Sequence, residues 1–119
     1  MKKADIIRNG SVISRNGHIA DNFFSRFRGL MFKKSIDNDY VLHITPCNQI
    51  HMFNMRFAID VVYLSPQGLV VKVDENVKPN KICKTVKGAE SVLEMRSFAA
   101  SEFGIEEGDS IEIRAKRGD

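Results

Sequence analysis

The chain has 119 residues, of which 43% are hydrophobic and 28% are charged. This length suits one domain with its own core and excludes a multidomain enzyme. The 18 basic and 15 acidic side chains leave a formal charge of +3, far from the dense positive surface of a dedicated nucleic-acid-binding protein. We expect a single domain over residues 1–119, with its core at about 5–114, and no nucleic acid partner.

The basic first residues are not followed by an apolar stretch of signal-peptide length, and no segment is apolar enough for a membrane span. Cys47 and Cys83 lie far apart and outside any Cys-x-x-Cys spacing, which is typical of free thiols in a reducing compartment. We therefore expect a cytoplasmic protein with no membrane partner.

Two Asn-Gly pairs, at 9–10 and 16–17, separate three short β-prone runs in the first 20 residues. Because both residues tolerate positive φ, each pair predicts a hairpin turn. The next segment has apolar residues at helical spacing, namely Phe23, Phe24, Phe27, Leu30 and Met31. This stripe predicts an amphipathic helix with Asp21 as its N-cap and Gly29 where it ends.

The sequence pattern predicts short strands for most of the remaining chain. The predicted strands are 40–45, 58–64, 69–73, 84–87, 91–95 and 110–114. Residues 65–68 form the turn of the clearest hairpin, and Ser97 caps a second short helix at 98–103. No helix is long enough to imply repeated βαβ units. We expect a mainly β, single compact antiparallel β-sandwich or barrel-like domain with one or two short helices.

Chemically functional side chains are most concentrated in residues 45–60, for which three interpretations are possible. Cys47 and His51 could form a nucleophile and base, or they could bind zinc with His43 or Asp60. The third catalytic group and the paired zinc spacing are both missing, so packing is the favoured interpretation and we expect no metal and no cofactor.

Two carboxylates interrupt apolar strands. Asp60 lies between Ile59 and Val61, where alternation could point it at water. If it faces inward it needs a partner, for which Arg28 or Arg56 is available. Glu94 lies in a strand with apolar side chains on both faces, so we expect it to be at least partly buried.

These segments together resemble the DUF192 (UPF0127) family over about residues 5–114. The resemblance is carried by Arg28-Gly29-Leu30-Met31-Phe32, the 51–60 block, 61–64, Gly68, Val92-Leu93-Glu94, Gly104 and Gly108-Asp109. Family members often have Trp-Met-Lys-Asn-Thr before a Pro-Leu-Asp step. Here Met52, Asn54 and Asp60 match, whereas His51, Phe53, Met55 and Ala58 replace the Trp, Lys, Thr and Pro. The resemblance implies a compact, mostly β fold with a short helix and no established activity.

Polar residues on otherwise apolar strands favour a non-enzymatic binding domain with a cleft for a small polar or anionic ligand or a peptide. The candidate cleft residues are Arg28, His51, Asn54, Arg56, Asp60 and Glu94. The alternative is a hydrolase or transferase that uses Cys47 with His51.

Overall fold

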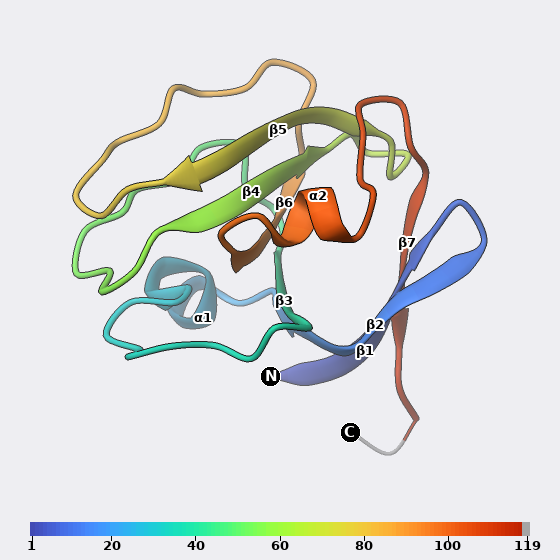
Figure 1. The fold of residues 1–119 in the computed structure, drawn as a ribbon, viewed down its shortest axis with the longest axis horizontal. Coiled ribbons are helices and arrows are strands. Elements are labelled where there is room, and N and C mark those ends of the chain that lie inside the picture. The colour runs from blue at the N-terminus through green and yellow to red at the C-terminus, as the bar shows by residue number, and fades with distance from the viewer. Residues whose placement is uncertain (118–119) are drawn as a thin grey trace.

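A computed structural model describes residues 1–117. Seven strands form one curled sheet in the order β5-β4-β6-β3-β2-β1-β7 (Figure 1). The strands are β1 (Lys2–Arg8), β2 (Ser11–Ala20), β3 (Tyr40–Ile44), β4 (Ile59–Leu64), β5 (Val70–Val77), β6 (Ser91–Arg96) and β7 (Ile111–Ala115). The helices are α1 (Phe23–Arg28) and α2 (Ala99–Glu102). The prediction of a mainly β fold with short helices is confirmed, and within the described chain no helix has the length and apolar character needed to cross a bilayer.

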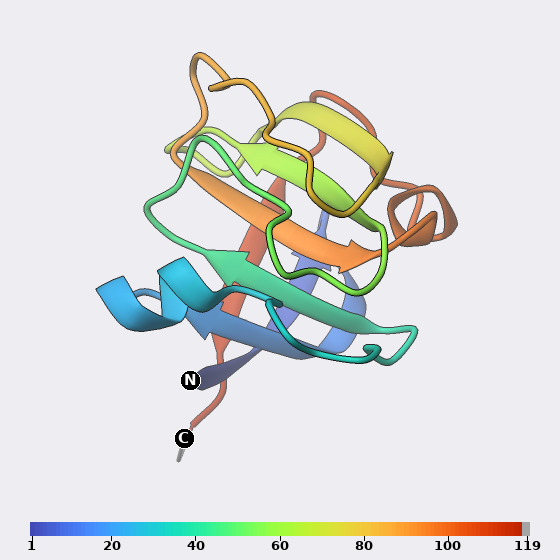
Figure 2. The ribbon, with the colours of Figure 1, turned by 90° about the vertical axis from the view of Figure 1, so that its left-hand side faces the viewer.

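Strand pairing is antiparallel throughout the described sheet, except where β2 pairs with β3 in parallel. Parallel neighbours need a long crossover connection because the chain must return to its starting end. Residues 21–39, which include α1, supply that crossover. The sequence did not predict this parallel pair, which places α1 at the ends of β2 and β3 (Figure 2).

The first predicted hairpin is confirmed, with positive φ at Asn9 and Gly10. The second is wrong, because β2 runs unbroken through Gly17. A Cβ on Gly17 would lie only 2.7 Å from the carbonyl oxygen of Ala4. Glycine is therefore needed there to let β1 approach β2 closely, and it forms no turn.

The helix predictions need two further corrections. Asn22, and not Asp21, caps α1, because its side chain accepts a hydrogen bond from the Ser25 N–H. α2 starts after Phe98 with no side-chain cap, and the Ser97 hydroxyl donates to Asn76 instead (3.0 Å). The predicted strand at 84–87 is also wrong, since these residues belong to a loop.

Both faces of the sheet are packed. Val61, Tyr63 and Leu42 point into one core cluster, which is covered by the loop before β4 and the loop between β5 and β6. Val62 and Leu93 point to the opposite face, where Ala99 and Ala100 of α2 pack against them. Consecutive strand residues alternate between faces, and the two helices lie on different sides of the sheet (Figure 2).

The sheet curls so that its edge strands β5 and β7 approach each other at one end. The N–H of Ile111 donates to the carbonyl of Gly68 (2.8 Å), and the N–H of Val70 donates to that of Asp109 (2.9 Å). These bonds join the β4–β5 turn to the start of β7.

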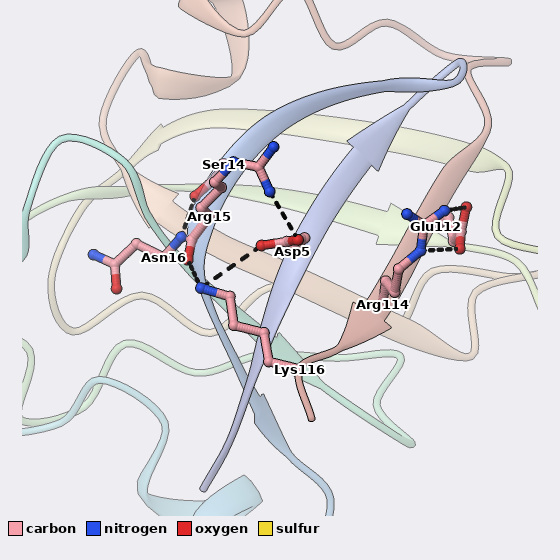
Figure 3. Close-up of polar contacts among 7 residues, drawn as sticks. All are labelled: Asp5, Ser14, Arg15, Asn16, Glu112, Arg114 and Lys116. Atoms are coloured by element: carbon pink, nitrogen blue, oxygen red, sulfur yellow. Dashed lines mark hydrogen bonds and ion pairs between the residues drawn. The ribbon is translucent and has the colours of Figure 1, made fainter. Parts of the chain in front are cut away.

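Charged side chains on the outer part of the sheet pair with one another (Figure 3). Asp5 lies 3.1 Å from Arg15 and 3.6 Å from Lys116, and Arg114 lies 3.1 Å from Glu112. Arg15 and Arg114 are well exposed, so these ion pairs contribute little to stability.

Candidate functional site

A cavity of about 50 Å³ lies under the C-terminal end of α1. A shallower groove of about 350 Å³ lies beside it and shares part of its lining. We call the cavity and the groove together the α1 cleft. The cavity is lined by residues 26–31, Ile44, Cys47, residues 49–51, Met55 and Glu94. Three distant parts of the chain therefore meet there: the crossover, the loop after β3, and the central strand β6.

Glu94 is the most important polar group of the α1 cleft. It shares a sheet face with its register partners Leu42 and Val61, and only 5% of its surface is exposed. No hydrogen bond or ion pair to Glu94 is present within residues 1–117. Burial raises the pKa of Glu94 to about 7. Because it has no partner in the described chain, the carboxyl group of Glu94 can form hydrogen bonds with a group that enters the cavity.

The end of α1 passes directly over this carboxylate. Gly29 ends the helix as predicted, with a φ of 48°. A Cβ at Gly29 would lie 3.4 Å from Oε1 of Glu94. A larger residue here would narrow the space above the carboxylate, so glycine keeps the cavity open.

Two arginines of α1 line the cavity, and neither forms an ion pair within the described chain. Arg26 donates through Nη1 to the carbonyl of Pro46 (3.3 Å), while its Nε is buried without a partner. Arg28 is exposed. The α1 cleft thus combines positive charge from α1 with a carboxylate from the sheet.

The outer part of the α1 cleft is aromatic. Phe23, Phe24 and Phe27 are 78%, 71% and 61% exposed, so the predicted stripe does not face the core as an amphipathic helix would. Leu30 and Met31, which follow the turn at Gly29, are buried instead. The helix has only six residues and ends before Leu30, so the buried part of the stripe lies outside α1.

His51 is half-buried and extends this aromatic wall. Its ring centroid lies 6.0 Å from that of Phe27 and 5.3 Å from that of Phe53. Its Nδ1 is buried with no hydrogen-bond partner among the described residues. His51 therefore presents both a ring face and an unused polar atom near the cavity.

Cys47 lines the same cavity but is not arranged as an activated nucleophile. Its Sγ donates to the carbonyl of Gln49 (3.2 Å), and no hydrogen bond joins it to His51 in residues 1–117. Burial raises the pKa of the Cys47 thiol, whereas activation requires a lowered pKa. The part of the chain that the structure describes also holds no group of three or more metal-ligating side chains.

Asp60 faces away from the α1 cleft. It pairs in register with Met95, which places it on the sheet face opposite Glu94. The carboxylate is fully buried and accepts hydrogen bonds from the N–H of Asn76 (2.9 Å) and of Ala100 (3.0 Å). Backbone amides, and not the predicted arginines, therefore satisfy it, and it ties β5 and α2 to β4.

The structure thus brings together Arg28, His51 and Glu94 of the predicted set. Asn54 and Arg56 are exposed and do not line the α1 cleft. The backbone carbonyl of Asn54 accepts from the N–H of Phe32 (3.0 Å), which ties the loop after β3 to the crossover.

Most of the residues that line the cavity are absent from the predicted set, among them Arg26, Phe27, Gly29 and Gln49. The sequence feature that could have indicated them is Gly29, which directly follows Arg28 at the end of a predicted helix. Such a glycine allows a close backbone approach, here to Glu94.

The fold and the α1 cleft define a small curled β-sheet protein with a cleft beneath a crossover helix. The model of the DUF192 family, described as "Uncharacterized ACR", matches residues 6–113. The chain therefore belongs to the DUF192 (UPF0127) family, which confirms the resemblance seen in the sequence.

Relatives from archaea and bacteria share the family or the fold. A UPF0127 protein of Thermococcus sibiricus is 32% identical over 108 residues, which is 87% of this chain and 69% of that protein. A UPF0127 protein of Pyrococcus furiosus is 31% identical, with 89% and 93% covered. The crystal structure of a protein of unknown function from Novosphingobium aromaticivorans superposes with a TM-score of 0.79 at 20% identity, covering 91% of this chain and 83% of that one. This last similarity shows the fold alone.

Proposed function

We propose that this chain is a small non-enzymatic binding domain whose α1 cleft holds a small polar ligand or a side chain of a peptide. The observation that carries the proposal is the buried carboxylate of Glu94, which lines a cavity and has no partner in residues 1–117. Buried polar groups are almost always hydrogen-bonded. A ligand that donates to Glu94 would satisfy it.

The composition of the α1 cleft supports the same proposal. Ligand sites are usually concave and largely apolar, with a few polar groups that fix the orientation of the ligand. Leu30, Ile44 and Ile50 supply apolar wall, and Glu94 and Arg28 supply the polar groups. A purely anionic group is disfavoured beside Glu94, so a negative charge on the ligand would belong near the arginines.

The alternative function, a hydrolase or transferase using Cys47 and His51, has less support. A cysteine nucleophile needs a base within hydrogen-bond reach or a lowered pKa. Cys47 instead donates to a backbone carbonyl, and burial raises its pKa. Binding is therefore the better-supported function.

A ligand-library thermal-shift screen tests the proposal. We expect ligands that stabilise the wild type but stabilise Glu94→Gln or Arg28→Ala less. Glu107→Gln and Arg56→Ala are matched controls, because both residues are exposed and lie outside the α1 cleft. A screen without stabilising ligands, or equal shifts in all five proteins, would contradict the proposal.

A further inference from the structure

We propose that the ligand of the α1 cleft is bipolar, with a nitrogen group that donates to Glu94 and a carboxylate that accepts from Arg26 and Arg28. This is the chemistry of a free amino acid with a large apolar or aromatic side chain. The inference rests on the proposed function, which it makes more specific.

The hydrogen-bonding groups around the cavity supply the first argument. Glu94 is 5% exposed and accepts no hydrogen bond within the described chain, and the Nε of Arg26 is buried without a hydrogen bond. Both side chains line the same cavity, yet they form no ion pair with each other in the described chain. Leaving a buried donor or acceptor unpaired is costly. A ligand with both a donor and an acceptor would satisfy the two groups at once.

The charges favour the same ligand. An ammonium group alone would be attracted by Glu94 and repelled by Arg26 and Arg28, and a carboxylate alone would experience the reverse. α1 carries no acidic residue in its first turn to offset its arginines. Only a ligand with both charges gains from both parts of the α1 cleft.

The two volumes indicate how such a ligand would lie. A cavity of about 50 Å³ has room for a few water-sized polar groups and not for an aromatic ring. The neighbouring groove of about 350 Å³ is lined by the exposed rings of Phe23 and Phe27 and by His51. The polar head would therefore enter the cavity, and an apolar side chain would pack against the rings in the groove.

Three probes with the same phenyl group test the inference: phenylalanine, phenethylamine and 3-phenylpropanoate. Their binding would be measured by calorimetry, and their location by shifts of the Gly29 and Glu94 amide signals in NMR spectra. We expect phenylalanine to bind about tenfold more tightly than either single-charge probe, since one charge-assisted hydrogen bond is worth about that factor.

Substitutions of Glu94 and Arg28 test which side chain contacts each charged group of the ligand. Glu94→Gln should weaken the binding of phenylalanine and phenethylamine about tenfold, and it should not weaken the binding of 3-phenylpropanoate. Arg28→Gln should weaken the binding of phenylalanine and 3-phenylpropanoate, and it should not weaken the binding of phenethylamine. Glu107→Gln and Arg56→Gln remove the same charges outside the α1 cleft and should change nothing.

The results separate this inference from the proposed function. If a single-charge probe bound in the α1 cleft as tightly as phenylalanine, the bipolar ligand would be wrong and the binding function would stand. If none of the probes shifted the two amide signals at millimolar concentration, the bipolar class would be overturned. Both proposals would fall only if the ligand library also gave no stabilising compound.

Discussion

The two buried carboxylates, Asp60 and Glu94, lie on the adjacent strands β4 and β6, but on opposite faces of the sheet. Asp60 accepts two backbone N–H bonds, and Glu94 has no partner within the described chain. Both interrupt apolar strands, so the sequence pattern does not distinguish them. Burial alone therefore does not mark a binding site. A buried group is a candidate for binding when its hydrogen-bonding capacity is unused and it faces a cavity.

The largest expected effect is on the Asp60 side. Asp60→Ala would leave the N–H groups of Asn76 and Ala100 buried and unsatisfied. Because each such loss costs about 1–3 kcal/mol, we expect the free energy of unfolding to fall by about 4 kcal/mol, measured by urea denaturation. Glu107→Ala is the exposed control and should change it by less than about 0.5 kcal/mol. A loss below about 1 kcal/mol for Asp60→Ala would remove the contrast between the two carboxylates.

The next largest effect is the dependence of the free energy of unfolding on pH, which arises from Glu94. The pKa of about 7 for Glu94 in the folded protein lies above its ordinary value of 4.5, so the folded protein holds this proton more tightly than the unfolded chain does. The contribution of protonated Glu94 to the free energy of unfolding is fully present below pH 4.5 and is lost as the pH rises through 7. At about 1.4 kcal/mol per pKa unit, the loss amounts to about 3 kcal/mol.

Glu94→Gln should remove that dependence. We expect the free energy of unfolding of the variant to rise relative to the wild type by about 3 kcal/mol between about pH 4 and pH 8. Denaturant unfolding at both pH values would measure it, and Glu107→Gln should follow the wild type. Parallel pH profiles for the wild type and Glu94→Gln would show that Glu94 is solvated or paired in solution.

A smaller effect concerns access to Glu94. Gly29→Ala would place a Cβ 3.4 Å from Oε1 of Glu94 at a positive φ, so we expect a loss of about 1–2 kcal/mol and weaker binding of any cleft ligand. Gly88→Ala has a positive φ as well, but its Cβ would meet nothing within 4 Å. It should lose stability without losing affinity, as measured by calorimetry. Equal affinity of both variants would argue against binding beside Glu94.

The smallest effect is on thiol chemistry. Burial raises the pKa of Cys47, so its alkylation in a Cys83→Ala variant should be slow at neutral pH. The rate should still be rising above about pH 8.5, where an ordinary free thiol titrates. A titration well below that value would restore Cys47 and His51 as a nucleophile and base.

The parts of the fold that were predicted correctly depend on neighbouring residues. The Asn9-Gly10 turn and the β4–β5 hairpin each arise from turn residues between β-prone runs, so the sequence signal is contained in a few positions. The failed prediction at Gly17 has the same local signal. There the deciding contact is with Ala4, on another strand.

The candidate site was predictable only in part, for the same reason. The sequence indicated Arg28, His51 and Glu94 as polar residues out of pattern, but it gave Asp60 equal weight. The face that each carboxylate occupies depends on the register between β4 and β6, and its partners depend on where β5 and α2 pack.

A small, mainly β member of the DUF192 family could be inferred from the sequence alone, because strand periodicity, turn residues and family motifs each lie within short segments. The three-dimensional structure was needed to show that β2 and β3 run parallel, that three phenylalanines of α1 stay exposed, and that Glu94 rather than Asp60 faces a cavity. Those outcomes depend on contacts between residues far apart in the chain, whose hydrogen bonds and packing no local pattern encodes.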